Sequence, residues 1–281
     1  MISFRVMKPT DLGFFMKLMD MVGWGMTPSD YDRILRFSPE GCFIASQDES
    51  DLGMVVTVNY GDIAWIGNLV VLPETRGRGI GAKLMQYSID YLVSTGTKAI
   101  RLDGVQLAIP LYHRLGFKDE YLSLRFLGKA KKHAETNCRP MTQDDLDAVN
   151  MLDQSVFKAP RIEILEYVYR KYPELCFTSW DGDELIGYIM AKDAKDQVKI
   201  GPWIAKQGYS AEAENLLYSV MNKRVGEALW VGVPEGNKAG VSILERNGFT
   251  RLPSSLRMCY GDSSVVEDVK SIYGLGGPDK G

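Results

Sequence analysis

One stretch of the chain decides the fold around it: Leu72-Pro73-Glu74-Thr75-Arg76-Gly77-Arg78-Gly79-Ile80-Gly81-Ala82-Lys83-Leu84. It follows an apolar run over residues 63–71, which predicts a buried strand, and it opens a segment over residues 80–93 with helical spacing of apolar residues. Glycines leave backbone N–H groups free to point at an anion, and a helix N-terminus adds partial positive charge. The stretch therefore predicts a phosphate site, with three basic side chains around it.

Two common phosphate ligands fit this turn poorly. It lacks the Gly-Lys-Ser/Thr ending of a nucleoside-triphosphate loop, so magnesium–ATP is not favoured. It also follows several predicted strands, whereas the dinucleotide fingerprint follows the first strand of its domain.

The overall composition is that of a globular protein with room for more than one domain. The 281 residues are 45% hydrophobic and 25% charged, with a net charge of -3, which predicts no nucleic-acid partner. No apolar run approaches the roughly 20 residues that span a membrane, and the N-terminus lacks the form of a signal peptide. The four cysteines show no metal-ligand or redox spacing, so we expect reduced thiols, no metal and a cytoplasmic location.

The second half of the chain repeats the plan of the first. The segment starting at Arg139 echoes the segment starting at Arg5, at an offset of 134, and Ser255-Leu256-Arg257 echoes Ser123-Leu124-Arg125, at an offset of 132. We therefore predict a first domain over residues 1–128, a linker over 129–137, a second domain over 138–273 and a flexible tail over 274–281.

Two motifs together resemble one family. Residues 76–81 fit the Arg/Gln-x-x-Gly-x-Gly/Ala signature of the GCN5-related N-acetyltransferases (GNAT family), and residues 111–117 resemble the family's Leu-Tyr-x-x-x-Gly-Phe helix. The resemblance covers nearly all of the first half, and the second half resembles the same fold with its cofactor motif worn away. It implies an α/β fold (an α+β mixed sheet) with two tandem GNAT-like domains, each a central, mostly antiparallel sheet flanked by helices.

The resemblance also implies roles for particular residues. The pantetheine arm of acetyl-CoA would pair with the backbone of Leu69, Val70 and Val71, and Tyr112 would be the general acid that returns a proton to the CoA thiolate. A backbone N–H of Val70 or Val71 would polarise the acetyl carbonyl. The pyrophosphate would lie on the backbone N–H groups of Arg76, Gly77, Arg78, Gly79, Ile80, Gly81 and Ala82.

The chain departs from the family pattern in both halves. An Asn often stands seven residues before the Tyr, and here that position is Val105, whereas the second half keeps Asn237 without the Tyr. The second turn, residues 205–212, has one glycine and ends on Glu212, which would repel pyrophosphate. We therefore expect one acetyl-CoA site, in the first half.

The general base and the acceptor pocket are less defined. Asp103, at the end of a predicted strand, is the candidate base, and Glu74 and Asp62 are weaker candidates. Trp24 and Met26 lie in a loop that lines the acceptor pocket in this family, and the sequence leaves open whether they line a pocket or pack in the core.

These features predict an acetyl-CoA-dependent N-acetyltransferase that acts by direct attack of an amine within a ternary complex. The acceptor would be a small molecule or an exposed protein amine. The alternative is a non-catalytic acyl-CoA sensor or interaction module. We expect no membrane partner, and either a monomer in which the second copy serves as a built-in partner or a homo-oligomer.

Overall fold

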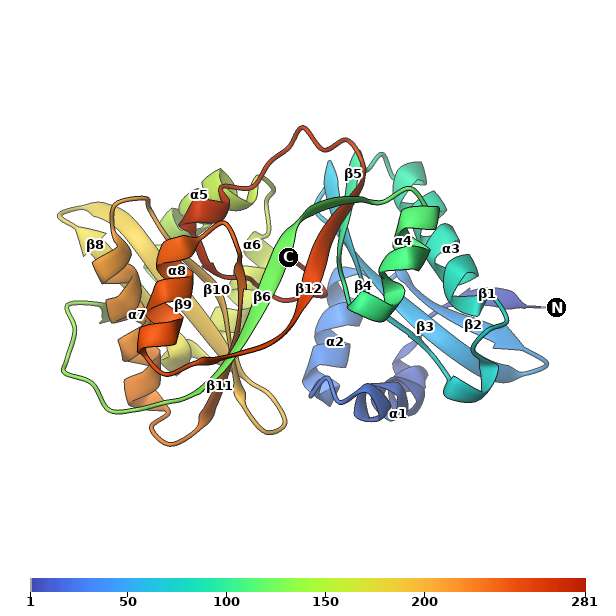
Figure 1. The fold of residues 1–281 in the computed structure, drawn as a ribbon, viewed down its shortest axis with the longest axis horizontal. Coiled ribbons are helices and arrows are strands. Elements are labelled where there is room, and N and C mark those ends of the chain that lie inside the picture. Colours follow the sequence, from blue (N-terminus) through green and yellow to red (C-terminus); the bar gives the residue numbers. More distant parts are fainter. Residues whose placement is uncertain (1) are drawn as a thin grey trace. The chain divides into compact units, whose positions relative to one another are not determined.

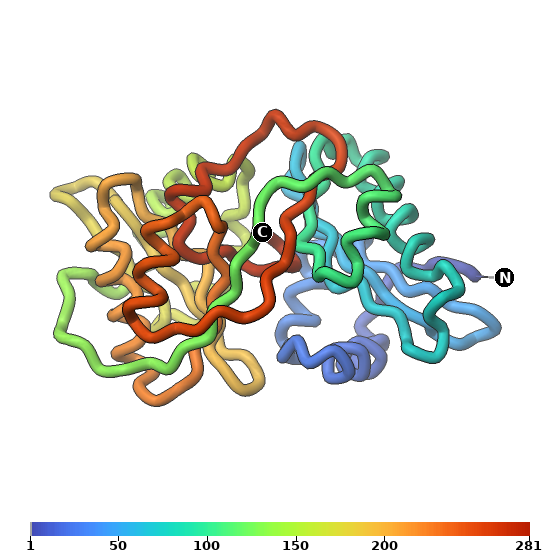
Figure 2. Tube along the Cα trace, viewed as in Figure 1, coloured from blue at the N-terminus to red at the C-terminus, as the bar shows by residue number. Residues whose placement is uncertain are grey.

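The computed structural model describes residues 2–281 and divides the chain into two compact units (Figures 1 and 2). The first unit contains the residues up to Glu120 together with Arg257–Ser264 and Pro278–Gly281. The second unit contains Tyr121–Leu256 and Val265–Gly277.

The strand order in the first unit is β1-β2-β3-β4-β5-β12, and helices cover both faces of this sheet (Figure 1). Its strands are β1 (Ser3–Val6), β2 (Cys42–Gln47), β3 (Ser50–Asn59), β4 (Ile63–Val71), β5 (Ala99–Gly104) and the end of β12 (Thr250–Gly261). Its helices are α1 (Leu12–Val22), α2 (Pro28–Phe37), α3 (Ile80–Ser94) and α4 (Ile109–Arg114), with short 3₁₀ helices at Pro9–Asp11, Pro73–Thr75 and Gln106–Ala108.

The strand order in the second unit is β7-β8-β9-β10-β11-β6, and β13 pairs with β10. Its strands are β6 (Lys118–Lys129), β7 (Arg139–Pro140), β8 (Cys176–Asp181), β9 (Glu184–Asp193), β10 (Val198–Ala205), β11 (Ala228–Pro234) and β13 (Ile272–Gly274). Its helices are α5 (Leu146–Phe157), α6 (Ile162–Lys171), α7 (Ser210–Lys223) and α8 (Lys238–Arg246), with 3₁₀ helices at Gln143–Asp145, Pro173–Leu175 and Val269–Ser271.

Each half of the chain sends its last long strand to the other unit, so the units are not the consecutive segments 1–128 and 138–273 that the sequence led us to expect. Most of β6 belongs to the second unit, where it pairs with β11, and the end of β12 belongs to the first unit, as neighbour of β5. The two strands carry the same Ser-Leu-Arg sequence. Both strands have the same side-chain pattern, and the two units offer similar sheet edges. The pattern therefore did not indicate which unit each strand would join.

Helices α1 and α2 cover one face of the first sheet, and α3 covers the other. Val56, Met54 and Val70 share a buried cluster with α1 and α2 side chains. On the opposite face, Phe43 makes edge-on ring contacts with Tyr87 and Tyr91 of α3. The sheet is therefore buried on both sides, which explains the near-continuous apolar run in β4.

Matching contacts in the two units confirm the internal repeat. Arg5 binds Asp11 at 2.7 Å, and Arg139, at the offset of 134, binds Asp145 at 2.6 Å. In each pair the carboxylate also accepts a hydrogen bond from the backbone N–H three residues before it.

Strand β13 fills the place where β10 and β11 diverge in the second unit. The parallel pairing of β10 with β11 is recorded at Val198–Ile200, whereas Trp203 and Ile204 pair with β13. The Leu275 N–H donates to the Gly232 carbonyl of β11 at 2.7 Å. A segment of the chain itself therefore lies between these two strands.

The last residues are packed and buried, in contrast to the flexible tail expected over 274–281. Leu275 is 6% exposed in the second unit, and Asp279 and Lys280 are 7% and 4% exposed in the first. The tail is rich in glycine, and its partners lie far away in the sequence, so its composition did not reveal that it would be buried.

Replacing Gly201 by Ala tests the close packing of β10 against the backbone that follows β13. The new Cβ would lie 1.9 Å from the Leu275 carbonyl oxygen, at a backbone φ of +139°. We expect a loss of stability of about 3 kcal/mol, from overpacking against backbone combined with left-handed strain, measured by urea unfolding.

Gly208→Ala is the matched control, since Gly208 also has a positive φ, +97°, but has open space around it. It should cost only about 1 kcal/mol. Equal losses in the two variants would contradict the close packing of β13 against Gly201.

Candidate functional site

The glycine turn leads into α3 without a side-chain cap. Gly77 and Gly79 have φ of +78° and +76°, a conformation that favours glycine. Gly79 is the N-cap residue, and the first turn of the helix contains no acidic side chain. The first N–H groups of this 15-residue helix are therefore suited to an anion.

The basic side chains of the turn are held by neighbouring groups. The Nε of Arg76 donates to the Val71 carbonyl at 3.1 Å, and Arg78 donates to the Gln47 side chain at 2.5 Å. Both arginines are exposed, so their charge surrounds the turn without blocking its backbone.

Strand β4 carries a β-bulge immediately before the residues predicted to bind the pantetheine arm. Gly67 pairs with Val56 and Val70 pairs with Met54, so two residues of β4 face one residue of β3. Asn68, inside the bulge, has a φ of +50°, which Asn tolerates better than most residues.

Beyond Trp65, β4 separates from β5. Their parallel pairing is recorded only at Ile63–Trp65, although β4 continues to Val71 and β5 to Gly104. Leu69, Val70 and Val71, the residues that the resemblance assigns to the pantetheine arm, therefore lie where the two strands diverge.

The Tyr112 ring is buried beside the end of β5. A Cβ at Gly104 would lie 3.0 Å from two ring carbons of Tyr112, so glycine makes room for the ring. Tyr112 is 8% exposed, and burial raises the pKa of its hydroxyl to about 12. Within residues 2–281 this hydroxyl has no hydrogen-bond partner, so the phenol stays protonated and available near neutral pH.

The turn, β4 and α4 meet at Gly81. A Cβ there would lie 3.7 Å from Val71 and 4.0 Å from Leu111, the residue before Tyr112. The structure thus brings together the helix start, the diverging strand and the Tyr112 helix.

Asp103 does not lie free for use as a base. Both of its carboxylate oxygens accept hydrogen bonds from Arg257, at 3.1 and 2.9 Å, and the two side chains are 1% and 0% exposed. The guanidinium of Arg257 also lies 5.0 Å from the Trp65 ring. The sequence did not indicate this pair, because Arg257 is 154 positions away and lies on strand β12 from the second half of the chain. The arrangement holds Asp103 in a buried ion pair and does not support it as the general base.

The weaker base candidates lie in different surroundings. Asp62 binds Lys98 at 2.9 Å in an exposed ion pair. Glu74 lies in the 3₁₀ helix before the glycine turn and is exposed. Neither observation assigns either carboxylate to catalysis.

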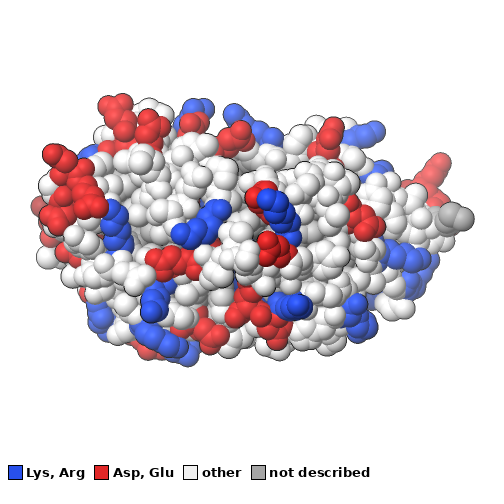
Figure 3. Space-filling view, turned by 90° about the horizontal axis from the view of Figure 1, so that it is seen from above, with Lys and Arg blue, Asp and Glu red and all other residues white. Residues whose placement is uncertain are grey.

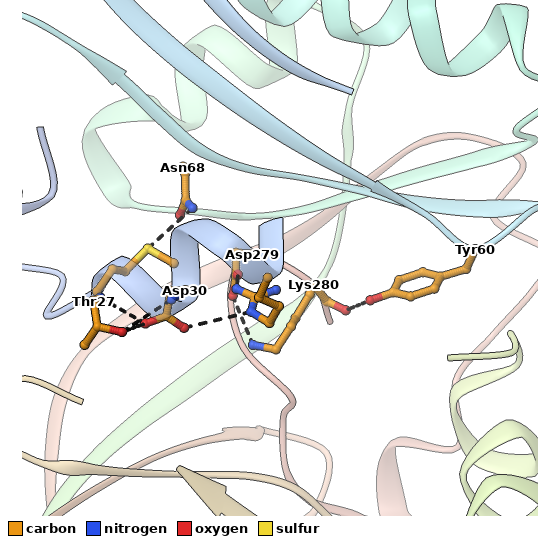
Figure 4. A network of polar contacts seen from close by, with 8 residues as sticks. Thr27, Asp30, Tyr60, Asn68, Asp279 and Lys280 are labelled. Atoms are coloured by element: carbon orange, nitrogen blue, oxygen red, sulfur yellow. Dashed lines mark hydrogen bonds and ion pairs between the residues drawn. The ribbon is translucent and has the colours of Figure 1, made fainter. Parts of the chain in front are cut away.

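Trp24 and Met26 pack against the core between the first sheet and its helices. Met26 is 7% exposed, and its sulfur accepts a hydrogen bond from the Asn68 side chain at 3.5 Å (Figure 4). Trp24 is partly buried against the same cluster. The loop between α1 and α2 is thus tied to the bulge of β4.

A polar network that the sequence did not reveal lies beside this loop (Figure 4). The terminal nitrogen of Arg33 donates to Asp279 at 2.6 Å, and its Nε lies 3.9 Å from Asp30. Burial alone would lower the pKa of Arg33, but the carboxylates of Asp279 and Asp30 outweigh it and raise that pKa. Asp279 lies 246 positions from Arg33 in the sequence, so no local signal linked it to α2.

The surface and the described side chains add three observations. Basic and acidic side chains are interspersed on the face shown in Figure 3. Among residues 2–281 no group of three or more His, Cys, Asp or Glu is placed to hold a metal ion. In the same residues, no helix has both the length and the apolar character needed to cross a bilayer.

Comparisons with known proteins agree with this fold. The GNAT acetyltransferase family model matches residues 15–117, and a second GNAT acetyltransferase domain model matches residues 149–274. The comparison with curated proteins returns no match.

Solved structures resemble the whole chain. A candidate acetyltransferase from Pyrococcus horikoshii is 23% identical, with a TM-score of 0.85 over 100% of this chain and 96% of its own. A GCN5-related N-acetyltransferase from Sphaerobacter thermophilus is 14% identical, with a TM-score of 0.67 over 92% and 95%. A tandem GNAT protein from the clavulanic acid biosynthesis pathway is 12% identical, with a TM-score of 0.65 over 95% and 100%.

The two domain matches together span most of the chain, so the protein belongs to the GNAT acetyltransferase family. It is a tandem member, with two GNAT domains in one chain.

Substitutions at the Asp103–Arg257 pair separate a structural role from a catalytic one. Arg257→Met leaves a buried carboxylate without its partner, and we expect a loss of about 3–5 kcal/mol in urea unfolding. The double variant Asp103→Leu/Arg257→Met should recover much of that loss, because it removes both charges.

Turnover gives the second measurement on this pair. Asp103→Asn, assayed where it is fully folded, should keep kcat within about twofold, since a general base typically contributes about 10²–10⁴-fold. A fall in kcat of that larger size, with intact folding, would restore Asp103 as the base.

Proposed function

We propose that the protein is an acetyl-CoA-dependent N-acetyltransferase whose working cofactor site is in the first unit. The observation that carries this proposal is the convergence at Gly81 of the uncapped start of α3, the diverging part of β4 and the Tyr112 helix. The turn suits a pyrophosphate, because it combines left-handed glycines, free helix N–H groups and no first-turn carboxylate.

The residues of the first unit supply the steps that acetyl transfer needs. A backbone N–H of Val70 or Val71 would donate to the acetyl oxygen as negative charge develops there. The acceptor nitrogen forms a bond to the acetyl carbon as the carbon–sulfur bond breaks, and Tyr112 would give its proton to the departing sulfur. The proton that the amine loses passes to solvent, and Tyr112 regains its own from solvent.

The second unit lacks the features that support a cofactor site in the first. Glu212 lies in the first turn of α7, where a carboxylate opposes a phosphate. β13 pairs with β10 where that strand has separated from β11, and the Asn237 side chain donates to the Ile272 carbonyl of β13 at 2.9 Å. We therefore propose one acetyl-CoA site per chain.

A non-catalytic acyl-CoA sensor is the alternative, favoured by one observation: the candidate base Asp103 is held in a buried ion pair. Calorimetry with acetyl-CoA and a free-thiol assay with a panel of amines separate the two. Binding with no turnover on any amine would indicate a sensor, whereas absence of binding at millimolar acetyl-CoA would reject both.

Gly79→Glu tests the phosphate site. A carboxylate at the helix start should weaken acetyl-CoA binding by about 100-fold or more, because it places negative charge beside the pyrophosphate. Gly79→Gln is the matched control, with the same backbone strain and nearly the same size but no charge, and it should lose about tenfold or less. Equal affinities in calorimetry for the two variants would contradict an anion at this turn.

Tyr112→Phe tests the proton donor. We expect kcat to fall by about 100-fold, in the range of general acid catalysis, with acetyl-CoA affinity unchanged within about twofold. An unchanged kcat would remove Tyr112 from the mechanism.

The pH dependence of the native enzyme gives a further measurement on Tyr112. Since burial raises the pKa of Tyr112 to about 12, its protonated form persists as pH rises through 10, where an ordinary tyrosine loses its proton. The rate should therefore show no Tyr112-dependent decline below pH of about 11. A decline centred near pH 10 that disappears in Tyr112→Phe would contradict the raised pKa.

A further inference from the structure

The last four residues, Pro278–Gly281, lie against β4 in the first unit (Figure 4). A Cβ at Gly67 would lie 2.7 Å from the Asp279 Cα, so the tail backbone approaches the strand where there is no side chain. The Lys280 carbonyl accepts a hydrogen bond from the Tyr60 hydroxyl at 2.7 Å. Residues 278–281 therefore have a defined position against Gly67, which is one residue before the bulge residue Asn68.

The tail lies on the face of the sheet that α2 covers. Gly67 pairs with Val56, whose side chain belongs to the α1–α2 cluster, and Asp279 binds Arg33 of α2. The glycine turn begins α3, which covers the opposite face. With the cofactor held from the α3 side, an amine would reach the diverging strands from the side where the tail now lies.

The guanidinium of Arg33 makes fewer hydrogen bonds than it could beside the tail. Its side chain is 2% exposed, and one terminal nitrogen donates to Asp279, but Nε and the other terminal nitrogen have no hydrogen-bond partner within residues 2–281. A guanidinium has five donors in a planar fork that matches a carboxylate with two parallel hydrogen bonds. The hydrogen bond to Asp279 uses one terminal nitrogen, so the paired hydrogen bonds that the guanidinium could make with a carboxylate are not formed.

We propose that residues 278–281 are a built-in occupant of the acceptor site, and that Arg33 binds the carboxylate of an acceptor that carries both an amine and a carboxylate. The proposal rests on the acetyltransferase function proposed above. When the tail moves aside, the acceptor carboxylate takes the place of Asp279 on Arg33, and its amine points along β4 toward the bulge.

The charges around Arg33 favour such an acceptor over a simple amine. The tail brings a carboxylate and an ammonium together, with the Lys280 Nζ 3.2 Å from Asp279. A zwitterion that replaces the tail also brings one carboxylate and one ammonium, whereas a simple amine brings no anionic partner for Arg33, and the carboxylate of Asp30 lies farther away, at 3.9 Å. Loss of a charged partner from a buried guanidinium is costly, so only an anionic group replaces Asp279 well.

The test uses the full-length protein and pairs of acceptors that differ only in the carboxylate. Amino acids with the amine at increasing distance from the carboxylate are compared with the corresponding amines that lack it, by release of free thiol from acetyl-CoA. We expect kcat/KM at least about tenfold higher for the carboxylate-bearing member of the preferred pair, as a charged hydrogen bond in a buried site would give.

Variants at Arg33 and Asp279 locate the effect. Arg33→Met should abolish the carboxylate preference, and Arg33→Lys, which keeps the charge but not the fork, should reduce it. Asp279→Asn should lower the KM of carboxylate-bearing acceptors severalfold, because a neutral tail competes less well for Arg33. Asp183→Asn, the same change at an exposed position, is the matched control and should change nothing.

Acetyl-CoA affinity, measured by calorimetry on each variant, keeps the two proposals apart. If acetyl-CoA binds and amines are acetylated without a carboxylate preference, or if the preference survives in folded Arg33→Met or is undiminished in folded Arg33→Lys, the assignment of Arg33 is overturned and the acetyltransferase proposal stands. If the native protein fails to bind acetyl-CoA, the acetyltransferase proposal fails first. Thermal unfolding identifies a variant that does not fold, and Arg33→Lys with Asp279→Asn then decides the outcome.

Discussion

The separation of β4 from β5 beyond Trp65 is the constraint on which the first unit depends. Strands that part expose backbone groups that a sheet would otherwise pair, and a buried backbone group needs a partner. The bulge at Asn68 helps to turn β4 away, and Gly104 admits the Tyr112 ring at the end of β5. The glycine turn and α3 follow directly after β4, so the direction that β4 takes also sets the position of the proposed phosphate site.

In the second unit, backbone groups of the diverging strands β10 and β11 form hydrogen bonds with another segment of the same unit. β13 pairs with β10 at the point where β10 has left β11, and Asn237 and Gly232 bind the segment from the other side. The two units thus share one architecture, and they differ in whether the divergent strands are filled by β13. The second copy also lacks the glycine-rich turn that precedes α3 in the first.

Local sequence signals predicted the backbone conformation of the glycine turn and the short helix that carries Tyr112. The glycines at 77 and 79 need left-handed backbone, and the Leu-Tyr-x-x-x-Gly-Phe spacing places Tyr112 on a short helix, so both depend on neighbours in the chain. The ion pair of Asp103 was not predicted, because its partner Arg257 lies on a strand from the other half of the chain. The network of Arg33 with Asp279 was missed for the same reason, at a separation of 246 positions.

The sequence by itself determined the GNAT class, the internal repeat, the phosphate-type turn and the position of Tyr112 in its helix. Each of these is recorded in contiguous residues, as glycine conformation, apolar period or motif spacing. The tertiary structure decided which unit β6 and β12 would join, what fills the divergence of β10 and β11, and where Pro278–Gly281 would lie. Those outcomes depend on which of two similar sheet edges a strand pairs with, and on buried ion pairs between residues far apart in the sequence. No local sequence pattern specifies either.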